Sequence, residues 1–180
     1  VLLELPFRSG QSVQECVTEV MGKVGEKMAV SRFARIDTDG VIGSYVHMGD
    51  QIGVLVALNT TSDSDVVKGL AKDLAMHISW SNPEYLTRDQ IQQSAIDAER
   101  EIHRQWAIKE GKPEKVIDRI VDGRMTDFYS RVVLLEQAYI KDEDLTIQKL
   151  FDKAESEVGA PICIESFVRY RVGETEGDND

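Results

Sequence analysis

The chain contains two copies of one pattern, and this internal repeat limits what it can fold into. Residues 13–36 and 147–170 align without a gap at a constant offset of 134, and five of the 24 pairs are identical. Apolar residues match apolar ones with helical spacing before a shared glycine and with alternation after it. Each copy is therefore predicted to form a helix, a glycine stop at Gly25 or Gly159, and a strand.

Both predicted helices have a recognisable start. Ser12 and Glu15 have the spacing of a capping box, in which hydroxyl and carboxylate satisfy free backbone amides, and Thr146 takes the cap position in the second copy. A Leu-Leu-Glu run and an aromatic residue precede each copy, at residues 2–7 and 134–139. The alternation after each glycine predicts strands at 28–36 and 162–172.

The segment between the copies predicts a hairpin followed by a helix. Residues 41–46 and 52–58 are rich in β-formers and flank a turn that contains Gly49 and Asp50. Residues 62–79 carry an apolar stripe at helical spacing, and Asn82-Pro83 ends it. We expect the strand at 162–172 to join the hairpin in a three-stranded antiparallel sheet.

Residues 87–130 predict an antiparallel helical hairpin. Thr87 is expected to cap its first helix, Gly111-Lys112-Pro113 to break it, and a second helix to fold back. The apolar stripe of the first helix is predicted to be Ile91, Ala95, Ala98, Ile102 and Trp106, and the second presents Val116, Ile117, Ile120, Val121, Met125 and Phe128. These narrow stripes fit dimerisation through Ile102, Trp106 and Phe128, and an intramolecular seam explains them equally well.

The predicted fold class is α+β, with two related subdomains whose antiparallel three-stranded sheets pack on helices, plus a projecting antiparallel helical hairpin. The domain boundaries expected are 1–38 for a remnant of an N-terminal core subdomain, 39–86 with 131–173 for a C-terminal core subdomain, 87–130 for the hairpin arm, and 174–180 for a disordered acidic tail. The first subdomain is incomplete, because residues 1–10 are too short to supply the hairpin and helix that precede the second copy. We therefore expect this chain to lack such a segment or to receive it from another polypeptide.

Composition narrows the function classes. The formal net charge of -11 argues against direct nucleic-acid binding, and no apolar run approaches the length of a membrane span. Cys16 and Cys163 fall on the apolar faces of the repeat and are expected to be small buried residues in a reducing compartment.

An enzyme is the less favoured alternative. Glu99 and His103 lie one helical turn apart and are expected to form a surface pair rather than a metal site, and His77 beside the stripe is expected to be a partly buried histidine. His47 in the exposed turn is the histidine expected to have a recognition role. We expect no catalytic residue, metal or cofactor, because no nucleophile elbow, phosphate loop or zinc spacing is present.

Several segments together resemble one family. The predicted hairpin is similar to a segment of elongation factor Ts, the guanine nucleotide exchange factor of elongation factor Tu. The similar residues are Gly43-Ser44-Tyr45-Val46-His47-Met48-Gly49 and Ile52-Gly53-Val54-Leu55-Val56. Collinear similarity extends over residues 12–174 and includes Ala75-Met76-His77-Ile78, Val121-Asp122-Gly123-Arg124-Met125, Leu134-Leu135-Glu136-Gln137 and Phe167-Val168-Arg169-Tyr170-Arg171. The resemblance implies two related subdomains, an arm that dimerises in some members, and contacts to two domains of elongation factor Tu.

The resemblance also implies partner-binding residues. Val24 and Gly25 would meet the nucleotide domain of elongation factor Tu, His47 would face the partner from its hairpin turn, and Ile140 and Lys141 would meet the third domain. The family's Thr-Asp-Phe-Val segment, whose Asp and Phe loosen the nucleotide, has no counterpart, and Thr126-Asp127-Phe128 lies in the arm instead.

We therefore expect a core of elongation factor Ts that binds elongation factor Tu and promotes GDP release during protein synthesis, with exchange weakened by the missing part. The alternative is a structural or dimerisation module without exchange activity. The expected location is the cytoplasm, or alternatively the matrix of a mitochondrion or plastid.

Overall fold

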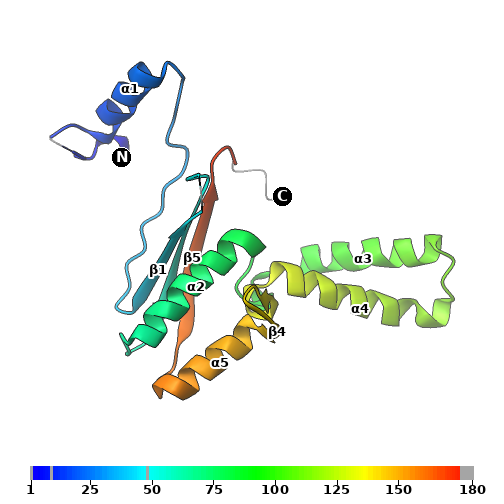
Figure 1. Ribbon diagram of the computed structural model, residues 1–180. Coiled ribbons are helices and arrows are strands. Elements are labelled where there is room, and N and C mark those ends of the chain that lie inside the picture. The colour runs from blue at the N-terminus through cyan, green and yellow to red at the C-terminus, as the bar shows by residue number, and fades with distance from the viewer. Residues whose placement is uncertain (1, 9, 48, 175–180) are drawn as a thin grey trace. The chain divides into compact units, whose positions relative to one another are not determined.

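The computed structural model describes residues 2–8, 10–47 and 49–174, so Met48 of the predicted turn and all of the predicted acidic tail except Glu174 lie outside the described residues. The chain divides into two compact units, residues 1–35 with 175–180 and residues 36–174. The second unit contains the sheet and nearly all of the core (Figure 1). The α+β class is confirmed.

The three-stranded sheet of the second unit is antiparallel with the order β1-β2-β5. It consists of β1 (Val41–Val46), β2 (Ile52–Asn59) and β5 (Cys163–Arg171), which confirms the predicted hairpin and its third strand. Gly49 and Asp50 adopt positive φ of 87° and 55° in the turn, as a tight hairpin requires. The register pairs Tyr45 with Val54 and Val54 with Arg169.

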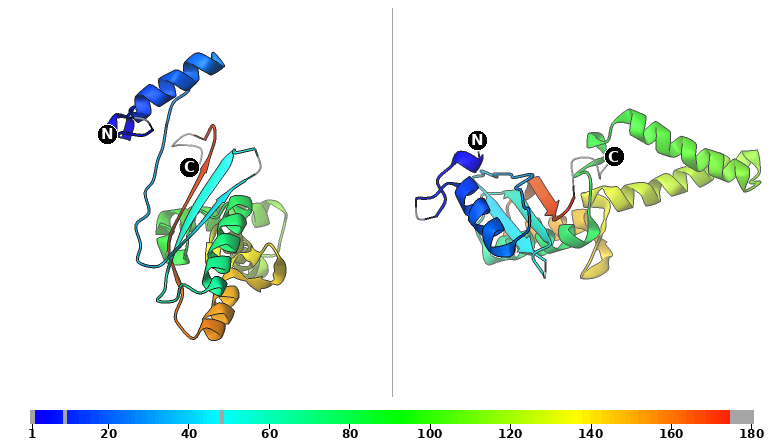
Figure 2. Two further views of the ribbon diagram at one scale, coloured as in Figure 1. Left: turned by 60° about the vertical axis from the view of Figure 1, so that its left-hand side comes forward. Right: turned by 90° about the horizontal axis from the view of Figure 1, so that it is seen from above.

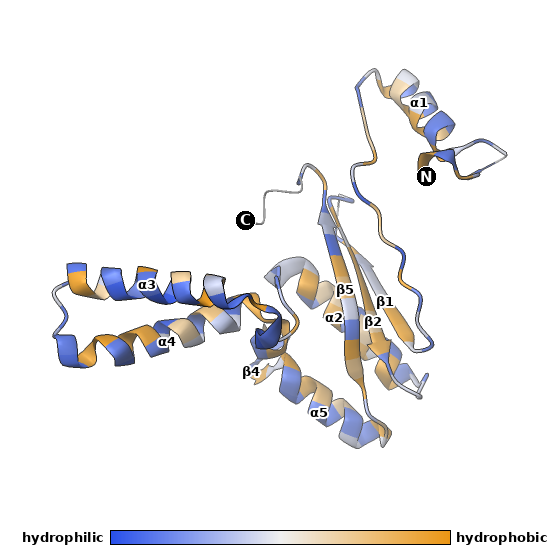
Figure 3. Ribbon diagram, turned by 180° about the vertical axis from the view of Figure 1, so that it is seen from behind, coloured by the Kyte–Doolittle hydropathy of each residue, from blue (hydrophilic) through white to orange (hydrophobic). Residues whose placement is uncertain are grey.

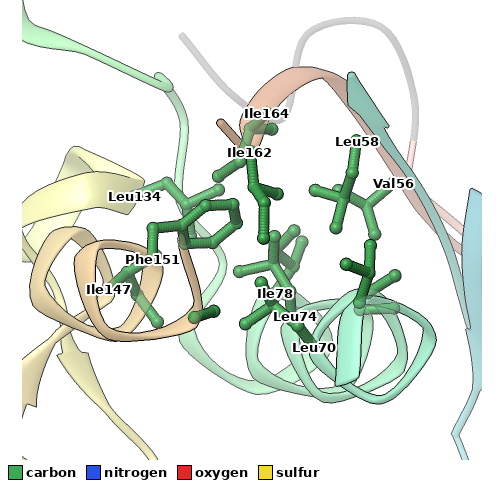
Figure 4. Packing of buried hydrophobic residues seen from close by; sticks show 14 of the residues in the cluster. Val56, Leu58, Leu70, Leu74, Ile78, Leu134, Ile147, Phe151, Ile162 and Ile164 are labelled. Atoms are coloured by element: carbon green, nitrogen blue, oxygen red, sulfur yellow. The ribbon is translucent and has the colours of Figure 1, made fainter. Parts of the chain in front are cut away.

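Helix α2 (Asp65–Ser81) covers one face of this sheet and begins three residues later than predicted, at a cap formed by Ser64. Gly43 permits the close approach, because a Cβ built there would lie 2.2 Å from the carbonyl oxygen of Ala71. Helix α5 (Ile147–Val158) packs beside α2. Figure 4 shows the core between the two helices and the sheet, with Phe151 directed toward Ile162 and Ile164.

A short two-stranded sheet lies between the arm and α5. The 3-10 turn η3 (Leu134–Glu136) leads into β3 (Ala138–Tyr139) and β4 (Asp142–Thr146), whose register pairs Tyr139 with Asp142. Ile140 and Lys141 therefore form a two-residue hairpin turn. This small hairpin was not predicted.

The arm is an antiparallel helical hairpin, as predicted, formed by α3 (Gln93–Lys109) and α4 (Glu114–Val132). The two helices lie side by side in the right-hand view of Figure 2, and the polar colour of α3 in Figure 3 reflects how little of it is buried. Gly111 between them has φ of 67°.

The start and the buried face of α3 were predicted incorrectly. Thr87 makes no side-chain cap bond, and residues 88–90 form the separate 3-10 turn η2 (Arg88–Gln90). The chain then leaves helical geometry at Ile91, whose side chain is buried with Val132 and Val133. The face of α3 that meets α4 contains Ile96, Trp106 and Ala107, so Ala95, Ala98 and Ile102 of the predicted stripe are exposed.

The first unit contains η1 (Leu2–Glu4) and α1 (Val13–Val24). The capping box of Ser12 and Glu15 is present, and Gly25 ends α1 in the left-handed conformation with φ of 76°. The strand predicted at 28–36 is wrong, because the structure assigns no strand there. A strand is held by hydrogen bonds to a neighbouring strand, and none of the described pairings includes this segment.

The structural correspondence between the two copies includes the segments before the repeated helices but not the strand after them. The elements η1 and η3 correspond, an isolated bridge between Pro6 and Ser12 corresponds to the pairing of Ala138 with Thr146, and α1 corresponds to α5. The two copies differ in burial. Helix α5 buries Ile147, Phe151 and Ala154, whereas no residue of α1 is buried.

The cysteines depart from expectation. Cys16 is half-buried and Cys163 is exposed, and both are free thiols. Ile162 and Ile164 on either side of Cys163 are 3% and 9% exposed, so the alternation of the strand turns Cys163 away from the core.

Candidate protein-docking groove

A groove of about 830 Å³ lies in the second unit where two hairpin turns meet the end of α2. One wall comes from the turn end of the sheet, with Tyr45, His47, Ile52, Arg169 and Arg171. The second comes from the last turns of α2, including Trp80, and the third from the β3–β4 hairpin, including Ile140. Three elements far apart in the sequence therefore form one concave surface.

His47 begins the turn between β1 and β2. Its N–H donates to the carbonyl of Ile52 at 2.9 Å, and its carbonyl accepts from the N–H of Asp50 at 3.0 Å. Its ring Nδ1 lies 3.4 Å from the hydroxyl of Tyr45, the neighbouring side chain on the same face of β1. The turn and the tyrosine thus hold the imidazole at the groove.

Ile140 and Lys141 share one turn but differ in their surroundings. Ile140 lines the groove and packs partly against the core. The Nζ of Lys141 lies 2.7 Å from Asp73 of α2, whose other carboxylate oxygen accepts from the hydroxyl of Tyr139 at 2.9 Å. Burial, and then the bond to Asp73, raises the pKa of Tyr139. Lys141 is therefore tied to α2 and does not line the groove.

A buried polar network fixes the angle between α2 and the β3–β4 hairpin. The ring of His77 is fully buried, and its Nε2 donates to Oε1 of Gln137 at 2.9 Å, while its Nδ1 lies 3.4 Å from the hydroxyl of Ser81. The amide of Gln137 donates to the carbonyl of Arg131 at 2.6 Å. Burial lowers the pKa of His77, and the bond to Gln137 only partly opposes this effect.

The two remaining partner-binding candidates, Val24 and Gly25, lie in the first unit at the end of α1. Val24 is 55% exposed, and the N–H of Gly25 donates to the carbonyl of Met21 at 2.9 Å. Of the five candidates, His47 and Ile140 are brought together in the groove. Val24 and Gly25 remain candidates at a separate helix end, and Lys141 remains one beside the groove.

Of the three residues predicted for dimerisation, two lie in the seam of the arm and one is exposed. Trp106 lies in the seam between α3 and α4, where the guanidinium of Arg124 stacks over its ring at 3.6 Å, and Phe128 packs against the same cluster. Ile102 is 60% exposed. His103 and Glu99 form the expected pair at 3.2 Å.

Sequence reasoning missed the groove residues Trp80, Arg169 and Arg171. Trp80 is 78% exposed although it belongs to a helix whose apolar stripe faces the core. A large aromatic residue that falls off such a stripe was the available signal. Arg169 was named only within a segment that resembles the family, and its phase on β5, shared with Phe167, could have placed it on the helix-covered face.

The described residues offer neither a metal site nor a membrane-spanning helix. Residues 2–8, 10–47 and 49–174 contain no group of three or more His, Cys, Asp or Glu side chains that could hold a metal ion. Across the same residues, every helix is too short or too polar to cross a bilayer.

An open groove with aromatic, aliphatic and basic walls suits a protein segment, which makes this a candidate protein-docking module. The family model of elongation factor Ts matches residues 1–174. Elongation factor Ts of Clostridium novyi (strain NT) is 42% identical over 176 residues, covering 96% of this chain and 58% of that protein. The relative from Clostridium perfringens (strain SM101 / Type A) is 42% identical over 174 residues, covering 96% and 57%. The chain belongs to the elongation factor Ts family, and it spans a little over half the length of these curated relatives.

Proposed function

We propose that this chain binds elongation factor Tu through the groove and promotes release of its GDP during protein synthesis in the cytoplasm. Family membership supports the partner. The observation that carries the proposal is the convergence of His47 and Ile140 in one groove, because they lie 93 residues apart in the sequence and the family resemblance implies a partner contact for each. Val24, Gly25 and Lys141 are proposed as further contacts.

The mechanism follows from reciprocal coupling of two binding events. A factor that binds the nucleotide-free partner more tightly than the GDP-bound partner must weaken GDP binding by the same ratio. Docking therefore accelerates GDP release only to the extent that it distinguishes the two states. Because binding and exchange are separable, each needs its own measurement.

The experiment combines calorimetric binding to elongation factor Tu with release of a fluorescent GDP analogue from it. We expect binding and faster release, and we expect His47→Ala and Ile140→Ala each to weaken binding by about tenfold, as for contacts near the centre of an interface. His103→Ala and Ile120→Ala on the arm are matched controls, and both should bind like the unmodified chain. Absence of binding, or equal losses in variants and controls, contradicts the proposal.

A homodimer through the arm is proposed as a second property. Ile102 and Ile108 on α3 are 60% and 53% exposed, so α3 retains exposed apolar side chains after Trp106 and Phe128 are used in the seam. Sedimentation of the chain and of Ile102→Gln tests this proposal. A single monomeric species at high concentration contradicts it.

A further inference from the structure

Two unusual features line the groove, an exposed indole and a mostly buried arginine with an unused donor. Both belong to the second unit, and neither was among the predicted contacts. Trp80 leaves 78% of its surface exposed at the end of α2. Arg169 on β5 has a side chain only 11% exposed. Together they indicate what chemistry the groove is built to receive.

Arg169 is incompletely satisfied. Its Nη1 lies 3.3 Å from Oε1 of Glu174, but its Nε is buried and has no hydrogen-bond partner among the described residues. A buried N–H without an acceptor is unfavourable, and an arginine presents its donors as a fork that fits a carboxylate. Because Arg169 lines the groove, a carboxylate entering there would meet a guanidinium whose donors the free chain does not fully use.

The charge of the groove points the same way. The chain carries a formal net charge of -11, yet Arg169, Arg171 and His47 line the groove with Glu143 as the acidic residue among its lining side chains. Glu174 offsets part of the charge of Arg169, but the groove remains less acidic than the chain as a whole, which favours an acidic segment there over a basic one.

Trp80 supplies the second half of the recognition. An indole is large, has few rotamers and is enriched among the side chains that dominate binding energy at interfaces. Met76 and Ile52 line the same groove, so an apolar side chain entering beside Trp80 would be enclosed on more than one side. The N–H of the indole can donate a further hydrogen bond at the rim.

We propose that Trp80 and Arg169 form a two-part subsite that receives a carboxylate flanked by a large apolar side chain from the partner. The proposal rests on the proposed function, and the occupant is an acidic-apolar segment of elongation factor Tu. Trp80 packs on the apolar side chain, and the guanidinium of Arg169 donates to the carboxylate, with Arg171 on the same groove wall.

The test uses the full chain with 5-fluorotryptophan in place of both tryptophans. Trp106→Phe identifies the Trp80 signal in the ¹⁹F NMR spectrum, since the chain has two tryptophans. Addition of unlabelled elongation factor Tu is expected to shift or broaden the Trp80 signal and to leave that of Trp106 in the arm unchanged. The partner contributes no fluorine signal, so the change reports on the groove alone.

Two variants measure the contributions separately. Trp80→Ala and Arg169→Met are each expected to raise the dissociation constant at least tenfold, and the loss in Arg169→Met is expected to shrink as salt rises because it removes a charged contact. Trp106→Phe and Arg104→Met on the arm are the matched controls and should leave the dissociation constant unchanged. Circular dichroism checks that every variant is folded.

Each other outcome overturns the proposal in a distinguishable way. If elongation factor Tu binds but the Trp80 signal and both dissociation constants stay unchanged, this subsite is wrong and the proposed function stands. If no form of the chain binds the partner, the proposed function fails and the subsite fails with it. If the Trp80 signal moves when the chain alone is concentrated, a second copy occupies the groove.

Discussion

The His77–Gln137 contact offers the sharpest test of how the fold holds the groove. Replacing His77 by Leu keeps a side chain of similar volume but removes the donor to Oε1 of Gln137, 2.9 Å away. Gln137 is 4% exposed, so water cannot replace the lost partner easily. Leaving a buried polar atom unsatisfied costs about 1–3 kcal/mol, and we expect a loss of about 2 kcal/mol in the free energy of unfolding near pH 7.5.

The same variant should change the pH dependence of stability. Burial holds the pKa of His77 below its ordinary value near 6.5, so the unfolded chain binds a proton that the folded chain does not. Stability is therefore fully present above about pH 6.5 and falls as the pH drops toward the folded pKa, with a slope of at most about 1.4 kcal/mol per pH unit for one proton. His77→Leu removes this term, so its penalty should shrink on acidification.

The assay is urea unfolding followed by circular dichroism in steps from pH 7.5 to 5.5, with and without the substitution. His103→Leu on the arm is the matched control and should retain the slope attributed to His77. A double-mutant cycle with Gln137→Leu should give a coupling of about 0.5–3 kcal/mol, as for residues in one hydrogen-bonded network. The reasoning is refuted if unmodified chain and His77→Leu have parallel pH profiles, or if the unmodified chain gains stability as the pH falls.

Three further outcomes are expected. Gly43→Ala should destabilise the chain by about 3 kcal/mol or more in urea unfolding, because the new Cβ would overlap the backbone of Ala71, whereas Gly53→Ala on the next strand has open space and should cost far less. Ser12→Ala should weaken α1 by about 1 kcal/mol, measured as faster amide exchange in that helix, since the capping box is lost. A fragment of residues 36–174 should unfold at the same urea concentration as the whole chain, because the buried core belongs to that unit, and a markedly lower midpoint contradicts this.

The sequence predicted those elements whose cause is local. Ser12, Thr146, Gly25 and Gly159 act through bonds within a few residues, and the structure confirms all four at helix ends. The hairpin of β1 and β2 likewise follows from adjacent β-formers and a turn with positive φ. Such signals are readable because little outside the segment can change them.

The predictions were wrong where the structure of a segment depends on contacts with residues far away in the sequence. Residues 28–36 have the alternation of a strand, but alternation does not supply the neighbouring backbone that makes one. Helix α3 has apolar residues on two faces. The face that packs on α4 contains Ala107, because a small residue there allows the two helices to approach closely. Ile91 is drawn instead into the cluster with Val132 and Val133, which ends the preceding turn before α3 begins.

The groove could not be read from the sequence because its walls depend on tertiary placement. The family resemblance indicated His47 and Ile140, but it could not show that both line one groove. Their shared position depends on the angle between α2 and the β3–β4 hairpin, which the buried hydrogen bond between His77 and Gln137 fixes. The exposed indole of Trp80 lies at the end of α2, the helix that the His77–Gln137 hydrogen bond holds in place. A loosened network should therefore reduce partner binding without touching any proposed contact, so His77→Leu is expected to weaken binding to elongation factor Tu even where the fold remains intact.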